Sequence, residues 1–338
     1  MFAETTTKNS GNEYNYEIED DMQEYDCPGS LFDPVEIPRI CPRNFTQRRR
    51  VIDVTWVNHE LTSLELRLNE LWDVVDVFFI SESTISWKAI PLKNQTLMPK
   101  PLYLTEHWED FKKFHTKMVV NIIPPEVSFN TKYTGNLAIE MAQRDKELGS
   151  IQKLLSPHPE DLLIFADLDE IPRPHEIEKL ACGSLPQMPV CLTTSDSFYY
   201  YNYKCHLVTE WTMRPRVAQW QNAKSKCATT IQNASSHCSS CFGSVDFVRN
   251  KILSNADVIK DSKLQVDPDS ILDRIRNCKD VYLRKKVDSM MSYRNKVNFQ
   301  SIPLIVAKHP ERWPYLLGKG PLYEDEDIEI SRAGSIGT

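Results

Sequence analysis

The sequence of 338 residues is 41% hydrophobic and 26% charged, which is typical of a globular protein and excludes a wholly disordered chain. Its 40 basic and 47 acidic residues give a formal net charge of −7, which argues against a nucleic-acid partner bound through a broad basic face. The nine cysteines are odd in number, so at least one thiol stays unpaired. Sequons at Asn44, Asn94 and Asn233 favour a secretory lumen.

We expect no signal peptide and no membrane-spanning segment in this sequence. Its apolar runs are shorter than the roughly 18 consecutive residues that a spanning helix requires. The N-terminus lacks the basic segment followed by an apolar segment that a signal peptide contains. Either the protein is soluble where it is made, or an anchor is missing from this sequence, and both alternatives stay open.

Composition divides the chain into three parts. Residues 1–48 are acidic and contain prolines, so we expect a disordered N-terminal stem. Residues 49–318 show regular apolar patterns and are expected to form the catalytic domain. Residues 319–338 are expected to form an acidic C-terminal tail.

Strand-like and helix-like patterns alternate through the predicted domain. Segment 51–58 is a β-rich apolar run, 60–72 carries leucines at helical spacing, and 74–83 is a continuous apolar run typical of a parallel sheet. Strand, helix and strand in this order predict a right-handed crossover unit. We further expect strands at 117–125, 161–172 and 190–203, and helices at 134–155, 175–182 and 269–278. Asp269 is the expected N-cap of the last helix. The alternation predicts an α/β domain with a mostly parallel central sheet flanked by helices.

The acidic end of the segment LLIFADLDEIP is the main indication of function. A very hydrophobic strand delivers Asp167, Asp169 and Glu170 at its carboxyl end, the edge at which open α/β sheets bind ligands. Strand alternation predicts that Asp167 and Asp169 share one face, with Leu168 turned away. Two adjacent carboxylates repel each other unless a cation or proton lies between them, and their oxygens suit Mg²⁺ or Mn²⁺. Such an ion neutralises charge on a departing diphosphate.

Two other interpretations of this motif stay open. The acids can cap a helix that begins after Pro172, or form an ordinary polar loop. Haloacid-dehalogenase-type phosphatases also place D-x-D after a hydrophobic strand, with the first Asp as nucleophile and the second as acid/base. Against that chemistry, Ile171 stands where those enzymes usually carry Thr or Val, and several elements precede the motif here.

Four blocks of the chain, in order, resemble glycosyltransferase family 17. They are VNHELTSLELRLNELWDVVDVFFISES (57–83), EMAQRD (140–145), FADLDEIP (165–172) and SHCSSCF (236–242). The resemblance runs from about residue 51 to about residue 318. Ser236 and Ser240 depart from it, because the family carries Trp at both positions.

The resemblance implies a GT-A-like fold and an inverting, metal-dependent transfer of GlcNAc from UDP-GlcNAc to a β-linked mannose of an N-glycan. In such a transfer the acceptor hydroxyl attacks the anomeric carbon and one carboxylate takes its proton. The resemblance also implies Mn²⁺ or Mg²⁺ as cofactor and the Golgi or secretory lumen as location. The departures at Ser236 and Ser240 keep a non-catalytic glycan-binding pseudoenzyme as an alternative.

Analogy to GT-A enzymes makes His237 the third metal ligand, beside Asp167 and Asp169. Alternatively, His237 forms half of a zinc site with Cys238 and Cys241, although structural zinc needs four ligands and no second C-x-x-C exists. These two cysteines can also form a disulfide or remain buried thiols.

Further residues are expected to contact the sugar nucleotide: Asn58, Glu60, Glu82, Arg144 and Asp145. The first three follow or close strands that end at the same edge as Asp167. The resemblance makes Arg144 a nucleotide contact, since a guanidinium suits a diphosphate. The alternatives are a solvated ion pair of Arg144 with Asp145 and a turn capped by Glu82.

The general base and the sugar-stacking residues stay unassigned. Asp196 and Glu210 follow the acidic motif and are the candidates for the base. The aromatic residues of segment 198–203, together with Trp211 and Trp220, either pack in the core or stack on sugars.

Overall fold

The computed structural model describes nine segments of the chain: 48–90, 96–129, 133, 137–194, 198–207, 215–254, 266–280, 282–297 and 302–323. The predicted stem lies outside these segments except for Arg48, and the predicted tail lies outside them beyond Tyr323. The two candidates for the general base, Asp196 and Glu210, also lie outside the described residues, as does Trp211.

Within the described residues, eight strands form the central sheet, in the order β5-β2-β1-β6-β11-β8-β12-β7. Their bounds are β1 (Val51–Val57), β2 (Val77–Ser83), β5 (Met118–Ile123), β6 (Leu162–Phe165), β7 (Glu170–Pro172), β8 (Val190–Thr194), β11 (Arg216–Gln219) and β12 (Thr229–His237). The strands β5, β2, β1 and β6 are mutually parallel, and β8 is parallel to β12. The strand β11 runs antiparallel to β6 and β8, and β7 runs antiparallel to β12. The predicted α/β class is confirmed, with a mixed, largely parallel sheet.

Helices cover both faces of this sheet because alternate residues of its strands are apolar on both sides. On one face, α1 (Leu61–Leu71), η1 (Trp108–Lys117) and α6 (Pro174–Cys182) pack against a core that includes Phe78 and Ile80. On the other face, α5 (Glu147–Leu155) packs against Val77 and Phe79 of the same strand. Neighbouring residues of β2 therefore enter opposite cores.

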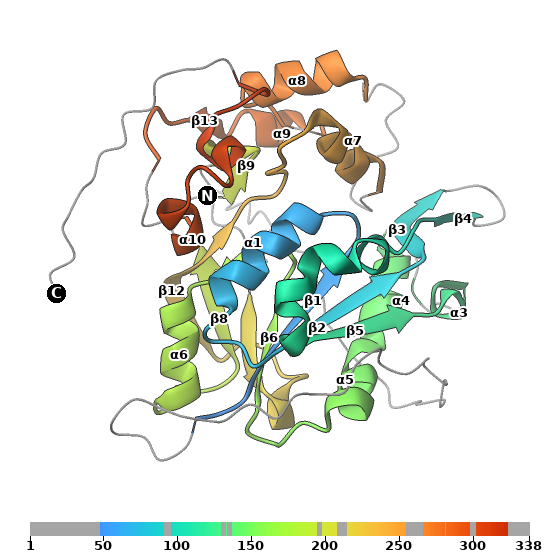
Figure 1. Ribbon diagram of the computed structural model, residues 1–338, viewed down its shortest axis with the longest axis vertical. Coiled ribbons are helices and arrows are strands. Elements are labelled where there is room, and N and C mark those ends of the chain that lie inside the picture. Colours follow the sequence, from blue (N-terminus) through green and yellow to red (C-terminus); the bar gives the residue numbers. More distant parts are fainter. Residues whose placement is uncertain are drawn as a thin grey trace, which may run out of the picture.

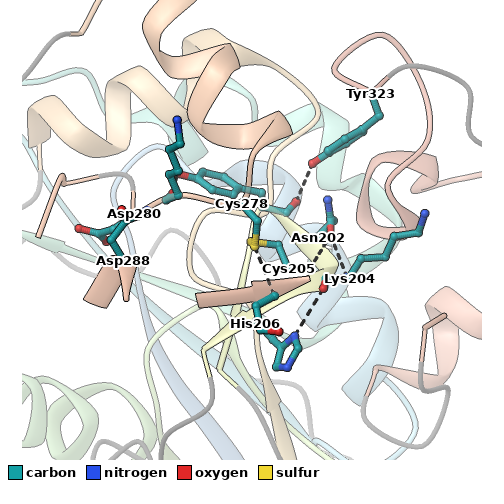
Figure 2. Close-up of a disulfide and its surroundings, with 11 residues drawn as sticks. Asn202, Lys204, Cys205, His206, Cys278, Asp280, Asp288 and Tyr323 are labelled. Atoms are coloured by element: carbon teal, nitrogen blue, oxygen red, sulfur yellow. Dashed lines mark hydrogen bonds between the residues drawn. A yellow bond between two sulfur atoms is a disulfide. The ribbon is translucent and has the colours of Figure 1, made fainter. Parts of the chain in front are cut away.

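A second, smaller unit lies beside the sheet, at the top of Figure 1. It contains the three-stranded sheet β13-β10-β9 and the helices α7, α8 and α9. Their bounds are β9 (Phe198–Tyr200), β10 (Asn202–Leu207), β13 (Met291–Tyr293), α7 (Val245–Ser254), α8 (Pro268–Arg276) and α9 (Lys285–Asp288). A separate core includes Leu207, Val248, Ile252 and Ile271. Figure 2 shows the disulfide between Cys205 and Cys278 that joins β10 to the segment after α8.

The remaining elements are short. They are β3 (Ile85–Ile90), β4 (Thr96–Pro99), α2 (Tyr103–Glu106), α3 (Pro125–Phe129), α4 (Ala138–Asp145), η2 (Trp220–Asn222), α10 (Leu304–Lys308) and η3 (Pro314–Leu317). The strands β3 and β4 form an antiparallel pair next to α4 and α7.

Four predicted elements differ from the structure. The helix expected at 134–155 is two helices, α4 and α5, which meet at Lys146. The strand expected at 161–172 is interrupted after Phe165 and resumes as β7 at the far edge of the sheet. The strand expected at 190–203 is divided among β8, β9 and β10. The N-cap of α8 is Asp267, not Asp269, because the Asp267 carboxylate accepts a hydrogen bond from the Ser270 amide at 2.9 Å.

Candidate active site

The carboxyl ends of β1, β2 and β6 form the edge at which the sequence predicted a ligand site. The strand β1 is parallel to both neighbours, and Val57 lies opposite Glu82 in the register with β2. Asn58, Glu60 and Asp167 follow directly from the ends of β1 and β6, so they emerge at this same edge. The predicted gathering of these residues at one edge agrees with the strand order.

A buried guanidinium explains why the chain turns between β6 and β7. The Arg67 side chain is 0% exposed, and its Nε and Nη2 donate to the two oxygens of Asp53, each at 2.7 Å. Its Nη1 donates to the carbonyl oxygens of Asp167, at 3.1 Å, and Glu170, at 2.6 Å. One side chain of α1 thus draws both ends of the acidic turn together, and the carboxylate in β1 compensates its buried charge.

Asp167 forms an ion pair with Arg144 of α4. The Nη2 of Arg144 lies 2.5 Å from Oδ1 of Asp167, and its Nε lies 2.9 Å from Glu140. The guanidinium also lies over the ring of Trp87, 5.2 Å from its centroid. Burial would lower the pKa of Arg144, but the two carboxylates outweigh burial and raise it. The side chain of Asp167 remains 36% exposed, so a ligand can still reach it.

Asp169 is held between two basic side chains. Its Oδ2 lies 2.8 Å from Nζ of Lys251 in α7, and its Oδ1 lies 3.4 Å from Nε2 of His237 at the end of β12. Burial would raise the pKa of Asp169, but these two groups hold it well below its usual range. Burial would likewise lower the pKa of His237, yet the charge of Asp169 raises it. The negative charge of Asp169 is therefore compensated by two basic side chains, and its own side chain is largely buried.

Glu170 differs from both aspartates in its ionisation. It is 3% exposed, and its Oε2 accepts from the Asp167 amide at 3.2 Å. Burial and the neighbouring charge of Asp167 raise the pKa of Glu170 to about 7. This carboxyl group therefore exchanges a proton near neutral pH, whereas the neighbouring Asp169 stays ionised.

The segment after β1 completes this edge. The Oε2 of Glu60 accepts from the amides of Asn58, at 3.3 Å, and His59, at 3.1 Å. Burial would raise the pKa of Glu60, but the charges of His59 and Lys251 hold it below its usual range. The electrostatic influence of Lys251 thus reaches Glu60 as well as Asp169.

Two predicted nucleotide contacts have partners of their own in the structure. Both oxygens of Glu82 accept from the amides at the start of α2, from Leu104 at 3.0 Å and from Thr105 at 3.4 Å. This is the capping interpretation of Glu82. Asp145 accepts from the hydroxyl of Tyr133 at 2.5 Å rather than pairing with its neighbour Arg144.

The predicted three-ligand metal centre does not fit the side chains as they are arranged. Asp169 and His237 are neighbours, but Asp167 is paired with Arg144 and Asp169 with Lys251. In the part of the chain that the structure describes, no three His, Cys, Asp or Glu side chains converge closely enough to hold a metal ion. Two protein cations already balance the two aspartates.

The segment after β12 contains a disulfide. Cys238 and Cys241 are joined, which settles the alternatives of a zinc half-site and of free thiols in favour of the disulfide. Ser236 and Ser240, the two departures from the sequence resemblance, are both buried, with 4% and 1% exposure. In the sequence, the disulfide directly follows His237 and precedes α7, the helix that contains Lys251.

The tyrosines of segment 199–203 are core residues rather than a platform for sugars. The buried side chains are those of Tyr199, Tyr200, Tyr201 and Tyr203, each 2% exposed or less. Tyr199 and Tyr203 belong to the main core, and Tyr200 and Tyr201 to the smaller one.

Lys251 is the site residue that the sequence analysis missed. The apolar spacing of Val245, Val248 and Ile252 could have indicated the helix α7. No pattern in the sequence, however, indicates that the lysine of this helix contacts a carboxylate that precedes it by 82 positions.

The disulfides are consistent with the secretory pathway. Among the described cysteines, Cys191 pairs with Cys227, Cys205 with Cys278, and Cys238 with Cys241. Disulfides form and persist in oxidising compartments. Searched over the described residues, the helices include none that is long and apolar enough to cross a membrane.

Comparison with known proteins agrees with the resemblance found in the four sequence blocks. The chain is similar to the human β-1,4-mannosyl-glycoprotein 4-β-N-acetylglucosaminyltransferase, with 29% identity over 136 residues, or 40% of this chain and 24% of that protein. The rat protein of the same name is also 29% identical over 136 residues, covering 40% of this chain and 23% of its own length. The chain thus spans about a quarter of the length of the curated relatives it matches. The model of glycosyltransferase family 17 matches residues 39–322, most of the sequence, and the chain belongs to that family.

Proposed function

We propose that this protein is an inverting glycosyltransferase with a GT-A-type fold that transfers GlcNAc from UDP-GlcNAc to a β-linked mannose of an N-glycan. Family membership and the names of the relatives support the transfer of N-acetylglucosamine to a mannosyl glycoprotein. The resemblance of the sequence blocks supports the donor and the stereochemistry. The family match also favours this function over the phosphohydrolase alternative.

One observation carries the proposal: two aspartates and two positively charged side chains lie together at the carboxyl edge of the sheet. Asp167 and Asp169 follow β6, and Arg144 and Lys251 reach them from α4 and α7. Basic side chains beside carboxylates suit a sugar nucleotide, since its diphosphate needs positive charge and its sugar and ribose hydroxyls need acceptors.

The reaction follows from these groups. The acceptor hydroxyl oxygen forms a bond to the anomeric carbon of GlcNAc, and the bond from that carbon to the terminal phosphate oxygen of UDP breaks. The electron pair leaves with UDP, and the hydroxyl proton passes to a carboxylate of the site. Of the three acids in the turn, Glu170 is the one whose pKa is raised to about 7, which suits proton exchange near neutrality. The described side chains do not converge on a Mn²⁺ or Mg²⁺ ion, so the proposed chemistry depends on the residues of the site alone.

The test is turnover of UDP-GlcNAc with a defined N-glycan acceptor, measured by mass spectrometry with and without Mn²⁺. Asp169→Asn keeps the shape of the side chain and removes its charge, so we expect a loss of roughly a hundredfold or more in kcat/KM. The matched control is Asp273→Asn, which removes the aspartate of an exposed pair with Lys279 at 3.2 Å.

An unchanged rate in Asp169→Asn would rule out the assigned site. Absence of transfer from any UDP- or GDP-sugar, with binding intact, would favour the pseudoenzyme. Release of inorganic phosphate without an acceptor would favour a phosphohydrolase.

We also propose that the protein acts in the Golgi lumen. The disulfides Cys191–Cys227 and Cys205–Cys278 support an oxidising compartment, and the relatives act on glycoproteins, as their name says. Immunofluorescence of the full chain against a Golgi marker checks this.

A further inference from the structure

Lys251 of α7 places a positive charge inside the proposed active site. Its side chain is 12% exposed, and its Nζ lies 2.8 Å from Oδ2 of Asp169. Burial would lower the pKa of Lys251, but the carboxylates of Asp169 and Glu60 raise it, so the ammonium group stays charged. A permanent positive charge therefore lies at the carboxyl edge of the sheet.

The helix that carries this charge is anchored at several points. Val248 and Ile252, with 1% and 0% exposure, bury its inner face in the smaller core. The carbonyl of Ser254 at its end accepts from the hydroxyl of Ser86 at 3.2 Å. The backbone of Lys251 is thus set relative to the acidic turn, and only the side chain can adjust to a ligand.

The charges around Asp169 define what the site can receive. His237 contacts one oxygen of Asp169 and Lys251 the other, so this carboxylate is already compensated. Arg144 compensates Asp167 in the same way, at 2.5 Å. A divalent cation would compete with these bases for the two carboxylates, whereas an anion meets two basic side chains beside the partly exposed Asp167.

We propose that Lys251 is a donor-binding residue that contacts the diphosphate of the sugar nucleotide and supplies the positive charge that a divalent cation supplies in metal-dependent transferases. The inference rests on the proposed function, because it takes a nucleoside diphosphate sugar as the ligand. It predicts that the diphosphate binds without any divalent metal ion, and that binding depends on the ammonium group of Lys251.

The test is isothermal titration of the full chain with UDP and, separately, with uridine, in buffer containing EDTA. Wild-type protein binds UDP, and Lys251→Met weakens this binding by roughly tenfold or more, because a hydrogen bond to a charged phosphate is lost. Uridine has no phosphate, so its affinity stays the same in the variant. Lys251→Arg keeps the charge and recovers most of the UDP affinity.

Lys179→Met is the matched control, since Lys179 pairs with Glu176 at the same 2.8 Å but on the surface, where it is 67% exposed. Its UDP affinity should equal that of wild type. Unchanged uridine binding by Lys251→Met shows that the variant is folded. If both ligands are lost, the comparison of Lys251→Arg with wild type decides instead.

Two results would overturn the inference. One is UDP binding by wild type that is absent in EDTA and appears with Mn²⁺. The other is equal UDP affinity of wild type and Lys251→Met, or, where Lys251→Met does not fold, loss of UDP binding by Lys251→Arg. Either result leaves the proposed function standing if sugar transfer is observed, whereas failure of transfer under all metal conditions counts against the function itself.

Discussion

The parallel strands β5, β2, β1 and β6 and the smaller unit of β9, β10, β13, α7, α8 and α9 are stabilised in different ways. The parallel strands bury apolar residues on both faces, and Asp53 of β1 forms a fully buried ion pair with Arg67 of α1. The smaller unit has a separate, smaller core and the disulfide Cys205–Cys278. All three disulfides among the described cysteines lie outside the parallel strands. A small core benefits most from a covalent link, and one of the three, Cys205–Cys278, lies within the smaller unit.

Removing the buried guanidinium should damage the parallel strands most. Arg67→Met leaves the Asp53 carboxylate buried without its partner, so we expect the free energy of unfolding to fall by about 3 to 5 kcal/mol. Urea denaturation measures the change. Arg312→Met removes an exposed pair with Glu65 and should cost less than about 1 kcal/mol. Equal losses in the two variants would show that burial of the Arg67 pair is unimportant.

Removing the disulfide Cys205–Cys278 should instead lower the stability of the smaller unit. The disulfide Cys205–Cys278 closes a separation of 73 residues, so replacing both cysteines by serine should cost about 2 to 4 kcal/mol. Replacing Cys238 and Cys241, which are separated by 3 residues, should cost less than half as much. Hydrogen exchange should show the first loss at the amides of α8 and β10. Faster exchange in β1 and β2 instead would contradict the division into two units.

The folding stability should also depend on pH through Glu147 of α5, which packs on the parallel strands. Burial raises the pKa of Glu147 to about 7 from 4.5, although the charge of Arg144 opposes this shift. Between these pH values the folded protein keeps a proton that the unfolded chain has released, so this contribution to stability is lost as pH rises. Glu147→Gln cannot lose that proton, so its stability relative to wild type should increase by about 1 to 2 kcal/mol from pH 4.5 to pH 7. A constant difference between the two proteins over this range would refute the expectation.

The smallest expected effect concerns the cap of α8 in the smaller unit. Asp267→Ala removes the hydrogen bond to the Ser270 amide and should lower Tm by a few degrees at most. Asp269→Ala lies inside the helix and should change Tm less. Thermal denaturation followed by circular dichroism separates the two, and the reverse order would restore Asp269 as the cap.

The sequence predicted the parallel strands better than the rest because their apolar patterns are local. The strands β1, β2 and β5 and the helix α1 lie within the predicted segments, since each is a predominantly apolar run or a leucine repeat. The turn after Phe165 was not predicted, because Arg67 draws the chain together there from about a hundred residues earlier. Cysteine pairing and the contact of Lys251 with Asp169 depend on the folded chain in the same way.

Of the predicted site, the position of the acids after a buried strand and the common edge of β1, β2 and β6 could be predicted from the apolar pattern and the strand order. The partners of Glu82 and Asp145 do not, because α2 and Tyr133 lie elsewhere in the chain. The pairing of Asp167 and Asp169 with basic side chains could not be predicted either, because the charge of a carboxylate does not indicate which cation it contacts.

The acidic turn joins β6, in the middle of the sheet, to β7 at its edge. The two basic side chains that contact the turn come from different units of the molecule. Arg144 is carried by α4 beside the parallel strands, and Lys251 by α7 in the smaller unit. A ligand that contacts both side chains would therefore link the two units and stabilise their packing against each other.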